Sequence, residues 1–348
     1  MGIILAKSRK SFGETKNLRV INYGTHRVVM RIFLAGHNGM VGSAIHNVLQ
    51  EKTDYKVVTR SRDELDLTNQ NDVEKFLQSE KLDAVIIAAA RVGGINANLT
   101  YPAEFIYENI QIQTNLIHST HSANIQKLLF LGSSCIYPRT EDHILMEKDL
   151  LSGSFEGTNE PYAIAKIAGI KMCESYNRQY CRDYRSVIPT NLYGPRDNFN
   201  LENGHVIPAL MRRFHEAKIA KKNEVVVWGR GSVLREFMYV EDMADACLFI
   251  LELDRKSYTS KTEPTISHVN VGTGKDVTVR KLAEMLQKIV GFEGDIGFDE
   301  SKPEGASKKL MDSNLLNSLG WAHKFDLESG LIKTYEWYKE NQGLLRIC

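Results

Sequence analysis

The sequence lacks long apolar runs and an excess of charge of either sign. No stretch approaches the roughly 20 apolar residues that a membrane-spanning helix needs, so we expect no membrane association. The 44 basic residues nearly balance the 43 acidic ones, which leaves a formal net charge of +1. Such a balance leaves no large positive charge that would indicate binding to nucleic acid. Any anion that this protein binds must be held by a local cluster of cations.

Cysteine is scarce, and no C-x-x-C pair occurs. The chain has five cysteines, an odd number: Cys135, Cys173, Cys181, Cys247 and Cys348. This count and spacing indicate neither a disulfide framework nor a structural zinc site, and no metal is expected. A reducing, cytoplasmic compartment fits such a chain best.

The first 29 residues differ from the rest of the chain. They carry six basic residues against a single acid, Glu14, and show no sustained periodicity. A basic, acid-poor leader can be a transit peptide. We favour an N-terminal extension ahead of a natural start at Met30, because a predicted strand begins with the next residue. Residues 1–29 are therefore not expected to belong to the core.

From Arg31 onward, short apolar runs alternate with longer amphipathic stretches. This alternation is typical of a parallel sheet with crossover helices. The pattern predicts an α/β fold, a Rossmann-type doubly wound parallel sheet. Its strands are expected at 31–35, 56–60, 84–88, 127–132 and 185–189, and its helices near 41–51, 71–79, 101–123 and 162–180.

After Tyr193-Gly194-Pro195 the predicted elements become shorter, which indicates a smaller α/β substrate-binding lobe. A strand is expected there at 225–228 and helices near 280–290 and 326–341. A helix at 241–251 and a strand at 268–271 return to the first lobe. The predicted domains are therefore 30–195 plus about 238–272 for a cofactor, and about 196–237 plus 273–348 for a substrate.

A glycine-rich turn directly follows the first predicted strand. It has the form G-x-x-G-x-x-G, spans Gly36 to Gly42 and includes Asn38, Gly39, Met40 and Val41. Glycine permits a tight turn and lets a pyrophosphate approach backbone N–H groups at a helix N-terminus. Such turns also occur for packing reasons alone, but the position after the first strand favours a dinucleotide site.

Two arginines, Arg60 and Arg62, lie at the end of the second strand, where a dinucleotide fold normally carries an acid for the ribose 2′-hydroxyl. A carboxylate would repel a 2′-phosphate, whereas a guanidinium can bind it through two parallel hydrogen bonds. We therefore expect NADPH rather than NADH. The alternative is two solvated surface arginines that Asp63 or Glu64 neutralises.

Two further segments are predicted to contact the cofactor. Asp66 and Leu67 follow the second strand, where an acid could meet the adenine amino group. The small side chain of Ala89, in the run 88–90, would let the cofactor lie close to the third strand. Such a run is equally often part of the core.

Ser133, Tyr162 and Lys166 form the strongest constellation in the sequence. Tyr162 and Lys166 are spaced Y-x-x-x-K on a predicted helix, so both side chains lie on one face, a single turn apart. An ammonium beside a phenol favours the phenolate and lowers its pKa, so we expect Tyr162 to exchange a proton with a carbonyl oxygen. Ser133, at the end of the fourth strand, would bind the same oxygen.

Cys135 and His205 are candidates for a second proton-transfer pair. Cys135 comes two residues after Ser133, and a thiolate there, favoured by nearby cations, could remove a proton beside a ketone. His205 lies on the second lobe and could return a proton from the other face. The alternatives are a small apolar filler for Cys135 and a helix-start residue bonded to backbone for His205.

Taken in order, these motifs resemble the extended short-chain dehydrogenase/reductases, and long strings resemble the GDP-L-fucose synthase family within them. Examples are Leu131-Gly132-Ser133-Ser134-Cys135-Ile136-Tyr137-Pro138, Pro189-Thr190-Asn191-Leu192-Tyr193-Gly194-Pro195 and His205-Val206-Ile207-Pro208. The resemblance covers essentially everything from Met30 onward. It places Leu131, Gly132, Ser133, Ser134, Tyr162, Lys166, Pro189, Asn191, Leu192 and His205 beside NADPH.

The resemblance implies a two-stage reaction on GDP-4-keto-6-deoxy-D-mannose. Cys135 and His205 would act as base and acid in the epimerisation at C3 and C5, and NADPH would then reduce C4 with Tyr162 as the proton donor. Trp228 would pack against the guanine or ribose, and Arg213 and Arg235 would neutralise the diphosphate. The alternatives are an ordinary core tryptophan and surface arginines.

Two positions depart from the family pattern. Asn38 stands where members can carry arginine inside the glycine loop, which removes one cation from the 2′-phosphate site, and Glu304 replaces a more usual aspartate in the substrate lobe. The resemblance also implies a homodimer formed through paired long helices. Rival functions are a related epimerase/reductase such as a GDP-colitose synthase, and a non-catalytic NADP-binding sensor of the same fold.

Overall fold

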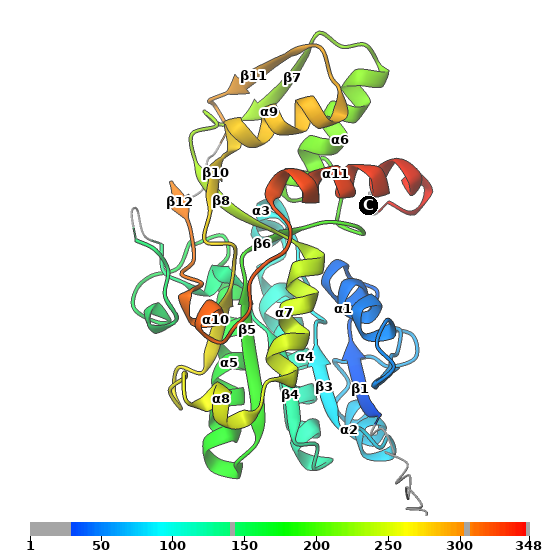
Figure 1. Cartoon of the computed structure of the whole chain (residues 1–348), viewed down its shortest axis with the longest axis vertical. Coiled ribbons are helices and arrows are strands. Elements are labelled where there is room, and N and C mark those ends of the chain that lie inside the picture. The colour runs from blue at the N-terminus through cyan, green and yellow to red at the C-terminus, as the bar shows by residue number, and fades with distance from the viewer. Residues whose placement is uncertain (1–28, 140–142, 303–306, 346–348) are drawn as a thin grey trace, which may run out of the picture.

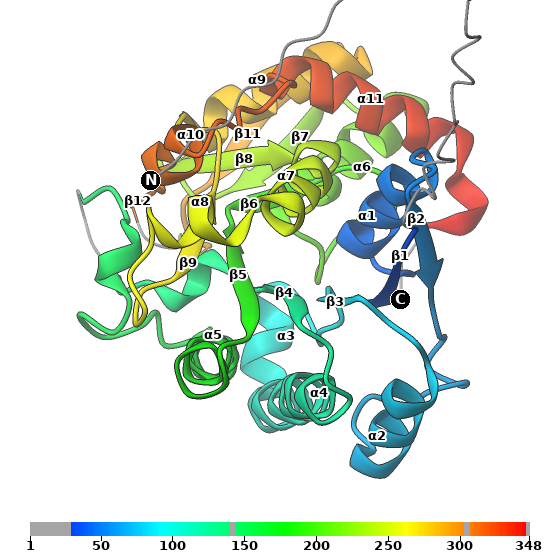
Figure 2. The same ribbon diagram turned by 60° about the horizontal axis from the view of Figure 1, so that its bottom comes forward.

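The computed structural model describes residues 29–139, 143–302 and 307–345. Apart from Val29, the expected N-terminal extension lies outside these residues, as does Glu304. Six parallel strands form the central sheet: β1 (Met30–Ala35), β2 (Tyr55–Val58), β3 (Ala84–Ile87), β4 (Lys127–Leu131), β5 (Asp183–Pro189) and β9 (His268–Val271). Their spatial order is β2-β1-β3-β4-β5-β9, which reverses between β1 and β3; Figure 1 labels β1, β3, β4 and β5, and Figure 2 also labels β2 and β9 at the two edges. Ligands bind at the carboxyl edge of such a switch point.

Helices cover both faces of this sheet, which confirms the predicted doubly wound α/β fold (Figure 2). One face carries α2 (Gln70–Ser79), α4 (Pro102–Ser122) and α5 (Glu160–Tyr180), and the other carries α1 (Met40–Gln50) and α7 (Val240–Glu252). All four residues of β3 are fully buried. Parallel strands that are covered on both faces need such continuous apolar runs.

The second lobe contains two small sheets. In one, β8 (Leu234–Tyr239) pairs with β6 (Asn191–Tyr193), β10 (Asp276–Thr278) and β12 (Lys308–Lys309); in the other, β7 (Glu224–Trp228) pairs with β11 (Asp295–Asp299). Around them lie α6 (Val206–Ile219), α9 (Val279–Val290) and α11 (Leu327–Glu340), which form the upper part of the molecule in Figure 1. Short helices α3 (Ile95–Thr100), α8 (Arg255–Thr259) and α10 (Asn314–Ser318) complete the described fold.

Helix α9 shows how the sequence builds this lobe. Leu282, Ala283, Leu286 and Val290 recur at helical spacing and are buried, as an amphipathic helix requires. The Thr278 side chain accepts the backbone N–H of Lys281 at the first turn, and Gly291 ends the helix in the left-handed region, at φ 72°. Both ends are therefore capped by the residues that favour such positions.

The two lobes share buried contacts. The Glu236 carboxylate, fully buried on β8, accepts backbone N–H bonds from Thr273 at 2.6 Å, Gly274 at 2.8 Å and Met311 at 3.1 Å. Trp321 packs in the core beside α7 and donates from Nε1 to Asp245 at 2.9 Å. Residues within 273–348 thus also pack on the first lobe, and the domain limits expected from the sequence stay a prediction.

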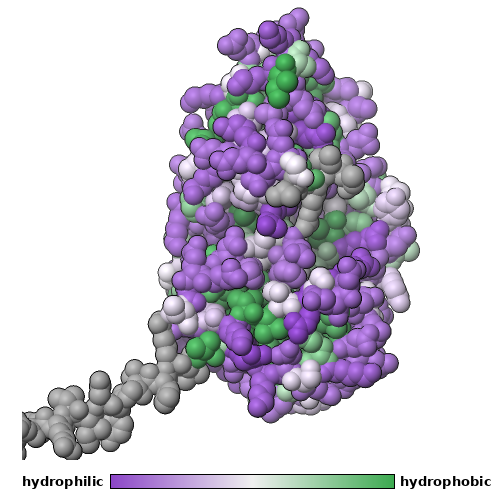
Figure 3. All heavy atoms as spheres, turned by 90° about the vertical axis from the view of Figure 1, so that its right-hand side faces the viewer, coloured by the Kyte–Doolittle hydropathy of each residue, from purple (hydrophilic) through white to green (hydrophobic). Residues whose placement is uncertain are grey.

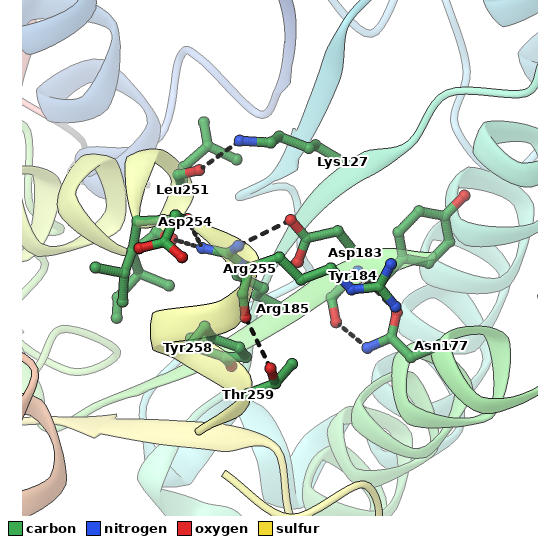
Figure 4. A network of polar contacts seen from close by, with 12 residues as sticks. Lys127, Asn177, Asp183, Tyr184, Arg185, Leu251, Asp254, Arg255, Tyr258 and Thr259 are labelled. Carbon is green, nitrogen blue, oxygen red and sulfur yellow. Dashed lines mark hydrogen bonds and ion pairs between the residues drawn. The ribbon is translucent and has the colours of Figure 1, made fainter. Parts of the chain in front are cut away.

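A polar network ties the amino-terminal edge of the sheet to α7 and α8 (Figure 4). The buried Arg185 guanidinium binds the Asp183 carboxylate, with Nε to Oδ1 at 2.7 Å, and donates to the carbonyl oxygens of Ile250 and Leu253. Lys127 donates to the Leu251 carbonyl oxygen at 3.3 Å. These contacts lie at the starts of β4 and β5, so the opposite edge of the sheet stays clear for a site.

Hydrophilic side chains predominate on the face shown in Figure 3, and hydrophobic ones gather there only in small groups. Within the described part of the chain, no helix combines the length and the apolar character that a membrane span requires.

Candidate active site

The glycine turn after β1 packs so closely against neighbouring backbone that side chains cannot be accommodated at two of its positions. Gly36 has φ 90°, and a Cβ there would lie 2.6 Å from the backbone nitrogen of Ala89. A Cβ on Gly42 would lie 2.0 Å from the Gly36 carbonyl oxygen. Both positions therefore require glycine. The small Ala89 adjoins the turn, as expected.

Helix α1 begins directly after this turn. Its N-cap, Gly39, has extended backbone, and no side chain caps the first turn. The buried Nδ1 of His37 has no hydrogen-bond partner among the described residues. Unpaired donors at a helix start suit the pyrophosphate of a dinucleotide. The arrangement fits NADP(H), with Gly36, Gly39, Met40, Val41 and Gly42 forming the cradle.

The two arginines after β2 differ in their contacts. Arg60 forms an ion pair with Glu80 at 3.1 Å and lies over the Phe76 ring at 4.8 Å. Arg62 is exposed, and its charge acts on Asp66. Asn38 is exposed in the glycine loop. Arg62 is thus the more exposed of the two, and its contact with a 2′-phosphate stays a prediction.

The two residues that are predicted to lie near the adenine, Asp66 and Leu67, contact other parts of the protein. The Asp66 carboxylate accepts hydrogen bonds from the backbone N–H and the hydroxyl of Thr68, at 2.9 and 2.7 Å, and these bonds lower its pKa. The Leu67 carbonyl oxygen accepts from the side-chain amide of Asn115 at 3.0 Å. Asp66 is exposed and ionised, so it can accept a further bond.

Ser133, Tyr162 and Lys166 come together at the carboxyl end of β4. The Ser133 hydroxyl is hydrogen-bonded to Tyr162, and the Tyr162 ring lies edge-on to Phe105 at 6.2 Å. The buried Lys166 ammonium donates to the Leu131 carbonyl oxygen at 2.8 Å and lies 5.8 Å from the Tyr162 ring centre. This geometry matches the constellation expected from the sequence.

The electrostatics of this group differ from the expectation. Burial raises the pKa of Tyr162 and lowers the pKa of Lys166 to about 8. The prediction that the ammonium lowers the phenol pKa toward working pH is wrong for this geometry, because desolvation penalises both charged forms and Lys166 bonds to a carbonyl oxygen. Tyr162 is therefore a neutral O–H donor.

Cys135 lies in a short 3-10 turn, Ser134–Ile136, just after Ser133. Its backbone N–H donates to the Ser133 hydroxyl at 3.4 Å, and the residue is partly buried. Burial raises the pKa of its thiol, while Lys309, Ser133 and Lys166 oppose that rise. The expectation that nearby cations favour the thiolate thus needs correction: they counteract desolvation without overcoming it.

His205 is the N-cap of α6. Its carbonyl oxygen accepts the backbone N–H of Ala209 at 3.1 Å, and its side chain caps no N–H. Desolvation by the surrounding protein, and then the charge of Lys309, lower the pKa of the imidazole. Lys309 thus acts on both Cys135 and His205, and a common site for the two groups stays a prediction.

Strand-end residues around these groups have structural contacts too. A Cβ on Gly132 would lie 2.4 Å from Ile188, and the side-chain amide of Asn191 donates to the Glu236 carbonyl oxygen at 2.8 Å. The remaining expected cofactor contacts lie on neighbouring elements: Leu131 and Pro189 end β4 and β5, Ser134 begins the 3-10 turn after β4, and Leu192 lies in β6.

The expected substrate residues fall into two clusters. Trp228, at the end of β7, is 49% exposed, and the Arg213 guanidinium carbon lies 5.7 Å from its ring centre. Lys302, which sequence reasoning missed, places its ammonium 5.5 Å from the same ring. Arg235 lies opposite Lys309 in the β8–β12 pairing, and its charge acts on Lys309.

Lys309 is the most important residue that the sequence did not reveal. It lies on a two-residue strand, and its sequence context, Ser307-Lys308-Lys309-Leu310, has no motif spacing. Only its proximity to Cys135 and His205 identifies it. Among the described residues, no group of three His, Cys, Asp or Glu side chains could hold a metal ion.

Comparison with known families and proteins agrees with this geometry. Residues 32–272 match the model of the NAD dependent epimerase/dehydratase family. The chain is 56% identical over 316 residues to GDP-L-fucose synthase of Escherichia coli (strain K12), covering 91% of this chain and 98% of that protein. It is 57% identical over 311 residues to GDP-L-fucose synthase 1 of Arabidopsis thaliana, covering 89% and 94%.

More distant relatives also match over most of the chain. GDP-L-colitose synthase of Yersinia pseudotuberculosis is 41% identical over 310 residues, covering 89% of this chain and 98% of that protein. Among solved structures, the GDP-mannoheptose C4 reductase MlghC of Campylobacter jejuni with NADP bound has a TM-score of 0.81 and 38% identity, covering 90% and 99%. The chain belongs to the NAD dependent epimerase/dehydratase family, in the group formed by its GDP-L-fucose synthase relatives.

Proposed function

We propose that this protein is a GDP-L-fucose synthase. It converts GDP-4-keto-6-deoxy-D-mannose to GDP-L-fucose by epimerisation at C3 and C5 and NADPH-dependent reduction at C4. The observation that supports this proposal is electrostatic: Cys135 interacts with Tyr162 at the end of β4, and Lys309 interacts with both Cys135 and His205. A plain reductase has no need of the thiol and the imidazole.

Epimerisation uses the acidity that the C4 ketone gives to its neighbouring carbons. The Cys135 thiolate takes a proton from C3 or C5, the C–H electron pair moves to the ketone oxygen as an enolate, and the sulfur becomes a thiol. His205, as imidazolium, returns a proton to the opposite face of that carbon. The lowered pKa of His205 makes its protonated form a stronger acid, although a scarcer one.

Reduction follows in the same site. NADPH supplies the hydride when bound. The neutral Tyr162 hydroxyl donates its proton to the C4 oxygen, and the Ser133 hydroxyl, which is bonded to Tyr162, holds the same oxygen. Lys166, fixed on the Leu131 carbonyl oxygen, places a positive charge behind the phenol that loses its proton.

The second lobe supplies contacts for the nucleotide. The exposed Trp228 ring offers a plane for guanine, and Arg213 beside it offers a forked donor for the diphosphate. Arg235, which lies opposite Lys309 on β8, would supply the second cation for the diphosphate. We retain Glu304, which lies outside the described residues, as a proposed substrate contact.

One experiment tests the function as a whole. Purified protein is supplied with NADPH and GDP-4-keto-6-deoxy-D-mannose in deuterated water, and the product is analysed by NMR. We expect NADPH consumption and deuterium at both C3 and C5. Label at C5 alone would favour a colitose-type epimerase/reductase, and the absence of both label and turnover would favour a non-catalytic sensor.

The Cys135→Ser variant separates the two stages. It should lose deuterium exchange far more than NADPH binding, because the hydroxyl is too weak a base to remove the carbon-bound proton. Equal loss of exchange and of NADPH binding would make Cys135 a structural residue.

The protein is further proposed to act as a cytoplasmic homodimer. A shallow hollow between the starts of α4 and α5 is lined by apolar residues such as Pro102, Ile106 and Ile164. Tyr107 on α4 is 64% exposed. A second copy covering this face would bury these side chains. Sedimentation of the wild type and of Tyr107→Asp tests this: a dimer that the charge dissociates is expected, and a monomeric wild type would contradict it.

A further inference from the structure

The orientation of Lys309 follows from the strand that carries it. In the parallel β12–β8 pairing, Lys309 lies opposite Arg235 and Lys308 opposite Leu234. Lys308 turns toward β10, where its ammonium lies 3.9 Å from the Asp276 carboxylate. Because successive strand residues point to opposite faces, the side chains of Lys309 and Arg235 share the other face, which borders the candidate active site.

Four separate segments of the chain approach the Lys309 ammonium. Its charge interacts with Cys135 after β4, with His205 at the start of α6, with Arg235 on β8 and with Glu156 before α5. Lys309 is partly buried, and its ammonium makes no hydrogen bond or close ion pair with another described residue. Burial disfavours the charge of such an ammonium, so a lysine in this position is unusual.

We propose that Lys309 is a positioning residue for the epimerisation: its ammonium stabilises the thiolate of Cys135 and so prepares the base that removes the carbon-bound proton. This inference deepens the proposed function and rests on it. Lys309 keeps its three protons throughout the step. The proton that leaves the carbon ends on the sulfur, and the electron pair of the broken C–H bond ends on the ketone oxygen.

The other charged and titratable groups around the pair do not replace Lys309. Cys135 also faces Lys166, Tyr162 and the Ser133 hydroxyl, but Lys166 is held on the Leu131 carbonyl oxygen and Tyr162 stays neutral. Lys309 itself faces Arg235, which disfavours its charge, and Glu156, which supports it. For His205, Lys309 is the one charged group that acts on the ring among the described residues.

Thiol alkylation tests the proposal without substrate or turnover. The full-length protein reacts with iodoacetamide between pH 6 and 10, and peptide mapping follows the rate at Cys135; the thiolate attacks carbon and iodide leaves. The exposed Cys181 serves as an internal reference. Lys309→Met should slow alkylation of Cys135 at pH 7.5 by about tenfold, and move the pH profile upward by about one unit, because each pKa unit changes the thiolate fraction tenfold.

Two further variants distinguish electrostatics from structure. Lys309→Arg keeps the positive charge and should restore most of the alkylation rate. Lys308→Met is the matched control from the adjacent position and should alkylate like the wild type. Circular dichroism and the urea unfolding midpoint identify a variant that fails to fold.

The outcomes separate this inference from the function that it extends. If folded Lys309→Met alkylates Cys135 with the wild-type pH profile, the role of Lys309 is refuted even where Cys135→Ser abolishes deuterium exchange. If Cys135→Ser retains exchange, the proposed function fails first. If Lys308→Met shifts the pH profile of Cys135 alkylation as far as Lys309→Met does, the effect comes from general surface charge, and the proposal is also overturned.

Discussion

The ammonium of Lys166 donates to the carbonyl oxygen of Leu131 at 2.8 Å. The bond crosses from α5 to the end of β4 and holds the lysine beneath Tyr162 and over the Phe130 ring, 4.8 Å from its centre. Lys166 is 3% exposed, and burial lowers its pKa to about 8. A lysine that is held this way affects stability as well as catalysis.

The lowered pKa of Lys166 predicts a pH dependence of stability. Between pH 8 and the ordinary value of 10.5, the unfolded chain binds one more proton at this lysine than the folded protein does. The free energy of unfolding should therefore rise with pH in that window, by up to about 1.4 kcal/mol per pH unit from this group. Lys166→Met should remove this contribution in urea unfolding at pH 7.5, 8.5 and 9.5.

A surface lysine provides the control for that comparison. Lys281 is exposed, and its ammonium pairs with the Glu284 carboxylate at 3.3 Å, so Lys281→Met should keep the wild-type slope. Parallel stability curves for the wild type and Lys166→Met would show that the folded protein holds Lys166 protonated throughout the window, against this prediction.

Replacing Tyr162 with Phe should separate reduction from epimerisation. Loss of the proton donor is expected to slow NADPH consumption about 10²- to 10⁴-fold. Deuterium exchange at C3 and C5 should persist, since it depends on Cys135 and His205. Both rates are measured on one sample, by NADPH absorbance and by NMR; if exchange falls as far as reduction, Tyr162 serves both stages.

The same tyrosine sets a limit on the pH profile of the wild type. Burial raises the pKa of Tyr162 above its ordinary value of 10.0. The phenol therefore stays protonated through neutral and mildly alkaline pH, and no loss of kcat from its ionisation is expected below pH 10. An alkaline decline that disappears in Tyr162→Phe would contradict this.

The first lobe could be predicted from sequence because its elements are long and strongly patterned. Continuous apolar runs such as Ala84–Ile87 and amphipathic stretches such as Glu160–Tyr180 are each determined by the burial of a whole face. The catalytic constellation followed from the same regularity, since Ser133 ends a predicted strand and Tyr162 and Lys166 share one helical face.

The second lobe could be predicted only in part. The strands β6, β10 and β12 have three residues or fewer, so their pairing with β8 depends on tertiary contacts rather than on a periodic pattern. Lys309 was missed for that reason. The pKa of Tyr162 was misjudged because helical spacing shows that two side chains are neighbours but reveals neither their desolvation nor the acceptor at Leu131.

The choice between NADPH and NADH should depend mainly on Arg62. Asn38 contributes no charge in the glycine loop, so Arg62→Ala should lower the preference for NADPH, measured as the ratio of kcat/KM values, by about 10- to 100-fold, the loss of one charge-assisted contact. Asn38→Arg should raise the preference. Equal preferences for NADPH in the wild type and in Arg62→Ala would mean that another group binds the 2′-phosphate.

Arg60 is the control for cofactor choice, since its guanidinium is already bound to Glu80 and stacked on Phe76. Arg60→Ala should leave the preference for NADPH unchanged. A shift as large as that of Arg62→Ala would mean that Arg60 releases Glu80 when the cofactor binds.

The Trp228 ring, with the cations of Arg213 and Lys302 close to it, should respond directly to the nucleotide. A guanine that stacks on this exposed plane changes the surroundings of Trp228, so GDP should alter its fluorescence, and Trp228→Ala should remove that part of the signal. The variant should also raise KM for the GDP-sugar about tenfold, the loss of about 1.4 kcal/mol of stacking, without changing NADPH affinity.

Lys302→Met tests the second cation near Trp228, whose ammonium lies 5.5 Å from the ring. If Lys302 contacts the diphosphate, this variant should raise KM for the GDP-sugar while kcat stays unchanged. If Lys302 only covers the Trp228 ring in the absence of nucleotide, the variant should bind GDP more tightly, because the guanine no longer has to displace the lysine side chain.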